Sequence, residues 1–115
     1  KMAQSSIPGE RAPAWADGRL YLWRMEQEDA RERMRKALDQ VHSWPAVYMF
    51  KFILEPEREK LDALLALFPS EAEVLRKYSK GGKYVSLTVR EVMMNAEEVI
   101  RRYDRTSQIP GVIAL

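Results

Sequence analysis

The chain has 115 residues, of which 46% are hydrophobic and 31% charged, and its formal net charge is +2 at pH 7. This balance is typical of one globular domain of ordinary size and excludes a disordered chain. The absence of cysteine excludes disulfides and thiolate metal sites, and it fits a reducing compartment, so we expect a cytoplasmic protein. The longest apolar runs are far shorter than the roughly 20 residues of a membrane-spanning helix.

The first part of the chain predicts a tail followed by a helix. Residues 1–19 are rich in Ser, Ala, Gly and Pro and have no hydrophobic period, which indicates a tail anchored by Ile7, Trp15 and the apolar run at 20–23. Residues 20–43 form an N-terminal extension, in which an apolar stripe from Ala30 to Val41 predicts a helix over 20–42. Trp44-Pro45 ends this helix, because a residue before proline disfavours the α region.

The remainder, residues 44–115, predicts one domain with the element order β-α-β-β-α-β. The run AVYMFKFIL is apolar at positions of both faces, which predicts a central strand covered on two sides. Two later segments have complete apolar helical stripes, and the second begins with the capping-box pair Asn95 and Glu98. The predicted strands are 46–54, 72–79, 83–93 and 112–115, and the predicted helices are 56–68, opened by Pro56 and stopped by Pro69, and 95–105.

This order predicts an α+β ferredoxin-like sandwich, with a four-stranded antiparallel sheet and two helices on one of its faces. The other face is left for the N-terminal helix, a partner or water. In the strand at 83–93, Val85, Leu87 and Val89 alternate with polar residues, which predicts one buried and one polar face.

Catalytic and metal-binding patterns are missing from the sequence. His42 is the only histidine, and it stands between a helix and Trp44, so we interpret it as a structural or surface residue. No spacing of His or Asp residues matches a metal site, and no nucleophile stands with a base. We therefore expect no enzyme activity, no metal and no cofactor.

Two surfaces are candidates for contact with a partner or ligand. One is the predicted polar sheet face, and the other is the basic hairpin around Lys80-Gly81-Gly82, which is also explained as a tight turn with solubilising lysines. RNA-binding domains with the same element order stack bases on aromatic residues of the sheet. Here the aromatics of the first strand share one face and fit the core better, so we do not expect nucleic acid. The candidate residues are Lys51, Ser86, Thr88 and Arg90 on the face, and Arg76, Lys77, Ser79, Lys80, Gly81 and Lys83 at the hairpin.

Four stretches carry a resemblance to a known family: KFILEP, YSKGGKYVSLTV, the helix end IRRYDR and the terminal PGVIAL. Over about residues 44–115 the chain resembles the YbeD-like family, a bacterial family of unknown function. The resemblance implies a ferredoxin-like domain similar to ACT regulatory domains, which bind amino acids and control enzymes. ACT domains bind ligand beside a glycine in the loop after the first strand, and the matching loop here, 54–57, has none.

Together these patterns favour a non-enzymatic regulatory or protein-interaction module. The alternatives are an ACT-like sensor of a small anionic metabolite or amino acid, and an RNA-binding domain. We also expect a two-fold homodimer held partly by the apolar residues between 7 and 23, with docking of that segment on its own domain as the alternative.

Overall fold

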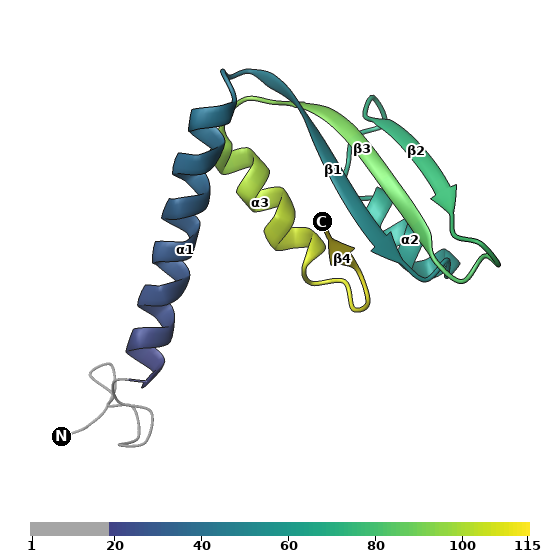
Figure 1. The fold of residues 1–115 in the computed structure, drawn as a ribbon, viewed down its shortest axis with the longest axis horizontal. Helices are drawn as coiled ribbons and strands as arrows, with labels where there is room; N and C mark the ends of the chain where they lie inside the picture. The colour runs from purple at the N-terminus through teal and green to yellow at the C-terminus, as the bar shows by residue number, and fades with distance from the viewer. Residues whose placement is uncertain (1–18) are drawn as a thin grey trace. The chain divides into compact units, whose positions relative to one another are not determined.

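The structure is a computed structural model that describes residues 19–115. The described part contains three helices and one four-stranded antiparallel sheet (Figure 1). Six of the seven elements agree with the predicted bounds within two residues, and α2 is shorter than predicted. The predicted tail and its anchors Ile7 and Trp15 lie outside the described residues. The elements are α1 Arg19–Val41, β1 Ala46–Leu54, α2 Arg58–Leu65, β2 Glu73–Tyr78, β3 Val85–Met93, α3 Ala96–Thr106 and β4 Ile113–Ala114.

The chain divides into two units, Lys1–Met34 and Arg35–Leu115. The part of α1 from residue 19 to residue 34, about two thirds of the helix, belongs to the first unit, and its residues 21–30 are exposed. The second unit holds the end of α1 together with the sheet, α2 and α3. There Leu38 is buried, and the Arg35 guanidinium on α1 donates to the Glu97 carboxylate on α3 over 2.5 Å.

The sheet of the second unit has the strand order β2-β3-β1-β4, and every neighbouring pair is antiparallel. β1 and β3 pair along nine residues each, from Ala46 opposite Met93 to Leu54 opposite Val85. β2 covers six residues of the outer side of β3, whereas β4 pairs with only Phe52 and Ile53 of β1. The two central strands, β1 and β3, are therefore the longest. Of the two outer strands, β2 is long and β4 is short.

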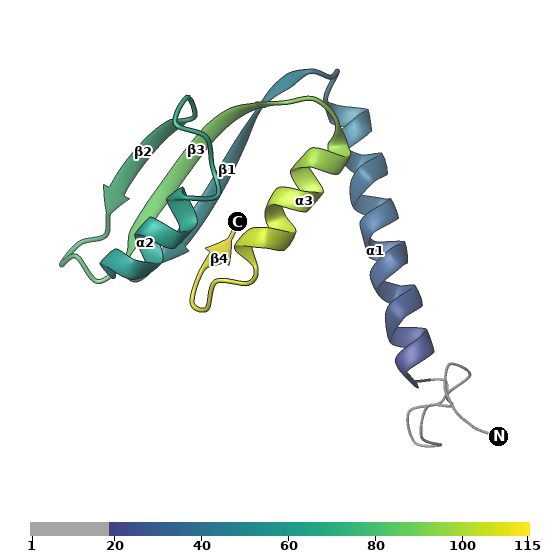
Figure 2. The same ribbon diagram turned by 180° about the vertical axis from the view of Figure 1, so that it is seen from behind.

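Both core helices lie on the same face of this sheet, as the two opposite views show (Figures 1 and 2). Phe50 of β1 contacts the ring of Phe68, which follows α2, with centroids 5.4 Å apart, and the ring of Tyr103 on α3, with centroids 5.2 Å apart. The core behind these contacts consists of fully buried residues of β1 and β3 together with Leu64, Val99 and Ile100 of the helices. The predicted placement of the two helices on one face is confirmed.

α2 ends earlier than its apolar stripe predicts. Its last regular residue is Leu65, and the chain then tightens, because Leu67 and Phe68 donate their backbone N–H groups to Leu64 and Leu65, both over 3.1 Å. Bonds of this i→i+3 kind narrow the final turn of a helix. Phe68, three residues past the last regular residue, is buried against the rings of Phe50 and Phe52. At the other end Pro56 lies before the helix, and Glu57 is its N-cap residue.

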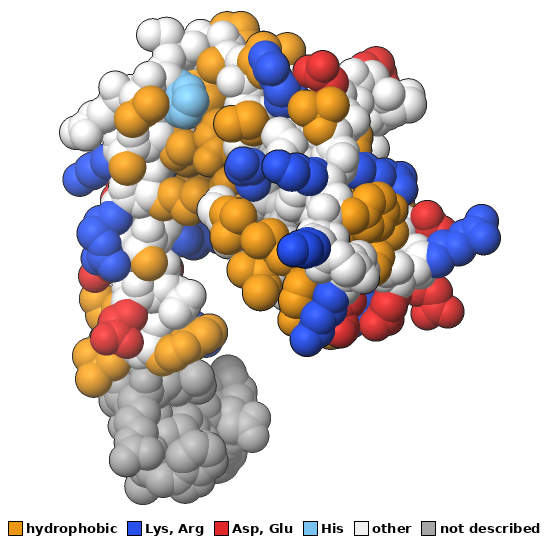
Figure 3. Space-filling model, turned by 45° about the vertical axis from the view of Figure 1, so that its right-hand side comes forward, with side chains coloured by type: hydrophobic (Ala, Val, Ile, Leu, Met, Phe, Trp, Pro, Cys, Tyr) orange, Lys and Arg blue, Asp and Glu red, His pale blue; other side chains and the backbone are white. Residues whose placement is uncertain are grey.

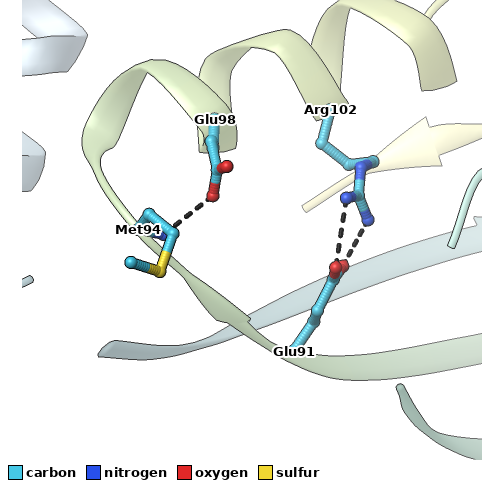
Figure 4. Close-up of polar contacts among 4 residues, drawn as sticks. All are labelled: Glu91, Met94, Glu98 and Arg102. Atoms are coloured by element: carbon cyan, nitrogen blue, oxygen red, sulfur yellow. Dashed lines mark hydrogen bonds and ion pairs between the residues drawn. The ribbon is translucent and has the colours of Figure 1, made fainter. Parts of the chain in front are cut away.

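α3 begins as the sequence predicts. The Asn95 side chain accepts a hydrogen bond from the Glu98 backbone N–H over 2.9 Å. The Glu98 carboxylate in turn accepts from the Met94 backbone N–H over 2.7 Å (Figure 4). These two bonds satisfy donors that a helix start leaves without partners. The returning carboxylate bonds one residue earlier than in the usual capping box.

One prediction about β1 is wrong. Its apolar residues do not lie under cover on both faces, because Val47 and Met49 are 55% and 53% exposed while Phe50 and Phe52 are fully buried. Antiparallel sheets commonly pack one face and leave the other open. The face without helices, which we call the open face, is the surface described next.

Candidate functional site

The open face is a regular array of side chains, because residues that alternate along each strand meet across the ladder. On β1 it presents Val47, Met49, Lys51 and Ile53, and on β3 it presents Val92, Arg90, Thr88 and Ser86 directly opposite them. β2 adds Glu73, Leu75 and Lys77, and β4 adds Ile113. Lys51 accepts a backbone hydrogen bond from Leu115 over 2.9 Å, which aligns the end of the chain with this array.

This face is mixed rather than polar, and that corrects the sequence-based prediction. Over β1 and β4 it is apolar except for Lys51, and over β2 and β3 it is mostly polar and cationic. Figure 3 shows hydrophobic side chains lying beside Lys and Arg side chains over the sheet. Six of its apolar residues are more than half exposed: Val47, Met49, Leu75, Val92, Ile113 and Leu115.

Five of the predicted contact residues meet on the open face, namely Lys51, Lys77, Ser86, Thr88 and Arg90. Arg90 forms an exposed ion pair with Glu73, with 3.5 Å between Nε and the carboxylate oxygen. Arg76 does not join them: it lies opposite Leu87 in the ladder, so its side chain belongs to the other face. The basic hairpin and the open face therefore meet where Lys77 lies opposite Ser86. Arg76, which we predicted at the hairpin, lies on the opposite face of the sheet.

The hairpin between β2 and β3 is built around Ser79. Its carbonyl accepts from the Gly82 N–H over 2.8 Å, and its hydroxyl accepts from the Tyr84 N–H over 2.9 Å. Gly81 and Gly82 have φ angles of 86° and 74°, which glycine adopts without strain and which the sequence predicted. Lys80 and Lys83 project from this turn, and Lys83 lies over the Tyr84 ring, 5.6 Å from its centroid.

Two hollows border the open face at its opposite ends. The one at the base of the hairpin has a volume of about 160 Å³ and is lined chiefly by Ile53, Lys77, Ser79, Tyr84 and Ser86. The other, of about 420 Å³, lies where β3 continues past the start of β2, between the Glu73–Arg90 pair and the loop 69–72. The hairpin hollow gathers three of the predicted contact residues.

A polar cluster on the packed face was missed by the sequence-based reasoning. Glu91 of β3 receives two hydrogen bonds from the Arg102 guanidinium of α3, one of them over 3.2 Å (Figure 4). The two side chains are only 15% and 16% exposed, and the guanidinium lies 4.6 Å from the Phe68 ring centroid. Glu91 lies on the same face of β3 as the buried Val85, Leu87 and Val89. An acidic residue at a position of the buried face was the sequence signal that could have indicated a buried ion pair.

Next to this pair, the hydroxyls of Tyr48 and Tyr103 are 3.0 Å apart. Burial raises the pKa of Tyr103 well above its usual range, and the hydrogen bond with Tyr48 raises it further. The Tyr103 phenol therefore stays protonated at neutral pH. The cluster is a hydrogen-bonded pair of hydroxyls beside a compensated ion pair, which fits a role in holding α3 against β1 and β3.

His42 and the carboxylates complete the inventory of reactive groups. The His42 ring lies 5.2 Å from the Trp44 ring and 5.4 Å from the Tyr48 ring, centroid to centroid. Across residues 19–115, no three His, Cys, Asp or Glu residues are grouped as they would be around a metal ion. In the same part of the chain, none of the helices combines the length and the apolar character that crossing a bilayer requires.

Residues 39–115 match the model of a family described as a protein of unknown function, DUF493. The chain belongs to this family. It is the YbeD-like family that the motifs of the sequence resemble, and the match starts within α1, five residues before the resemblance. No curated protein and no solved structure matches the chain. The YbeD-like domain therefore includes the end of α1 together with the whole sheet and both core helices.

Proposed function

We propose that the YbeD-like domain is a non-catalytic protein-interaction module of the cytoplasm, with a ferredoxin-like fold, which holds its partner on the open face. The strand order β2-β3-β1-β4 and the two helices on one face support this fold. The observation that carries the function is the exposed apolar half of the open face over β1 and β4. Contiguous exposed apolar surface of this kind marks interaction sites in proteins that fold as single domains.

The polar half of the face supports the same proposal. Interfaces combine an apolar centre with a polar rim, and the rim supplies specificity through hydrogen bonds and charge. Here Lys51, Thr88 and Ser86 lie beside the apolar residues and stay accessible. A partner that covers β1 and β4 meets these groups at its border.

Photo-crosslinking in cells that express the full chain tests this proposal. A photoreactive residue in place of Thr88 is expected to capture a discrete partner, whereas the same residue in place of Ala63, on the exposed side of α2, captures none. The double substitution Met49→Asp and Val92→Asp removes the apolar contacts and should abolish capture from position 88. Identical products from both positions, or capture that survives the two aspartates, would contradict a docking role for the open face.

The mass of the captured product separates two kinds of partner. A product of twice the mass of the chain identifies a second copy, which is the two-fold dimer that the sequence predicts. Any other mass identifies a different protein. Light scattering on the full chain gives the same distinction without crosslinking.

The hairpin hollow favours a second function, the sensing of a small anionic metabolite or amino acid. Lys77 borders the hollow and is exposed, so its ammonium group is available to a carboxylate. A ligand that binds only the folded chain raises its melting temperature. A rise with individual amino acids that disappears in Lys77→Met, but persists in Lys36→Met on α1, supports this alternative, and no rise with any of them rejects it.

A further inference from the structure

The outer side of β2 presents backbone groups that no other described strand uses. β2 is the last strand of the sheet on its side. The Ser79 N–H donates to Tyr84, and the Lys77 carbonyl accepts from the Ser86 hydroxyl over 3.3 Å, so both residues direct their backbone toward β3. Since backbone groups alternate in direction along a strand, Val74, Arg76 and Tyr78 direct theirs outward.

The charge of this part of the chain differs from that of the rest. Between residues 74 and 90 there are five bases and no acid: Arg76, Lys77, Lys80, Lys83 and Arg90. The whole chain has 19 bases and 17 acids, so the remainder carries 14 bases against 17 acids and is net negative. The net positive charge of the protein therefore lies in residues 74–90, between the two strand acids Glu73 and Glu91.

We propose that the partner engages this edge with an extended acidic segment, which adds to β2 as a fifth strand. An added strand pairs with the outward N–H and C=O groups of Val74, Arg76 and Tyr78, and its side chains alternate between the two faces of the sheet. Acidic side chains at alternate positions of the segment then meet either Arg76 on one face or Lys77 on the other, according to which face they occupy. This inference rests on the proposed function, because it names the kind of protein segment that the module binds.

Two other occupants fit the edge less well. A second copy of the chain brings the same cations, and the acid on its β2, Glu73, already pairs with Arg90. A nucleic acid supplies negative charge but no alternating row of amide donors and acceptors. Tyr84, the residue before β3, is a single aromatic ring and offers little surface for stacked bases.

The probe for this inference is a fluorescent peptide of alternating glutamate and valine, titrated against the full chain by anisotropy. Methylation of all its backbone nitrogens keeps the charge of the peptide and removes every N–H group that could pair with β2. We expect the methylated peptide to bind about tenfold more weakly, which is the loss of a main-chain hydrogen bond that strand addition predicts. Equal binding of the two peptides would show attraction by charge alone and would overturn the inference.

Substitutions in the protein test the same contact from the other side. Arg76→Pro removes an outward N–H that the β2–β3 ladder does not use, which edge strands tolerate, while Arg76→Ala removes the charge and keeps the N–H. The peptide should bind more weakly to the proline variant than to the alanine variant, with circular dichroism showing that both fold. Lys80→Glu with Lys83→Glu should abolish binding, and the affinity of the unchanged protein should fall as salt is added.

Three further outcomes would contradict strand addition at β2 without rejecting the proposed role of the open face. If oligouridylate competes with the peptide and also binds equally to the proline and alanine variants, the edge attracts polyanions without pairing. If light scattering shows a dimer that Arg76→Pro dissociates, a second copy occupies the edge. If position 88 captures a partner while the peptide fails to bind, the open face is an interaction site and the strand-addition mode is wrong.

Discussion

The two faces of the sheet are made by the same strands and differ in what covers them. On the packed face, Phe50, Phe52 and Leu87 are fully buried beneath α2 and α3, and the polar Glu91 is compensated by Arg102. On the open face, Val47 and Met49 alternate with these residues along β1 and stay more than half exposed. The difference shows that an apolar side chain on β1 belongs to the core only when it points toward the helices, and that apolar side chains of the opposite phase stay exposed.

The largest contrast between the faces is expected from two substitutions in β1. Phe52→Ala removes a buried ring and should lower the free energy of unfolding by about 3–5 kcal/mol. Met49→Ala, three residues earlier and on the open face, should change it by less than about 0.5 kcal/mol. Urea unfolding of the two variants measures both values. A comparable loss for Met49→Ala would show that the open face is covered in solution.

The compensated acid on the packed face gives the next largest effect. Glu91→Gln leaves the Arg102 guanidinium without its anion in a site that is mostly buried, and should cost about 2–4 kcal/mol. Glu73→Gln breaks an exposed pair with Arg90 and should cost less than about 1 kcal/mol. Equal losses would mean that burial does not distinguish the two pairs. A double-mutant cycle with Arg102→Met separates the pair energy from the cost of the unpaired cation.

The smallest effect is expected at the hairpin that joins the two polar strands of the open face. Ser79→Ala removes the acceptor of the Tyr84 N–H at an exposed position, and should cost about 0.5–1 kcal/mol. Lys80→Ala changes only an exposed side chain of the same turn and should stay within about 0.5 kcal/mol. Thermal unfolding resolves the two variants. An unchanged melting temperature for Ser79→Ala would show that water replaces the hydroxyl.

The elements were predictable where one local signal decides them. Asn95 and Glu98 mark the start of α3, and Gly81-Gly82 mark the turn, because capping and positive φ depend on residues close in sequence. The early end of α2 was not predictable in this way. Its stripe continues to Phe68, and only the contact of Phe68 with Phe50 and Phe52 of β1 shows why the last turn tightens.

The candidate site was predictable in part, because alternation fixes the phase of a strand but not what lies over it. In β3, the sequence places Ser86, Thr88 and Arg90 on one face correctly, yet Glu91 and Val92 reverse the pattern. Glu91 therefore lies on the packed face and Val92 on the open face. The ion pair with Arg102 of α3 explains why an acid is tolerated on the packed face. For β1, apolar residues in both phases predicted cover on both sides, whereas the structure covers one.

The uneven distribution of charge along the chain has a consequence for how partners approach. A domain whose residues 74–90 carry five bases and no acid, while the remainder of the chain is net negative, has a dipole in addition to its small net charge. Such a dipole turns the domain in the field of an acidic molecule before the two surfaces touch, so that productive encounters become more frequent. Salt then acts mainly on the rate of association, while the lifetime of the complex depends on the contacts made afterwards.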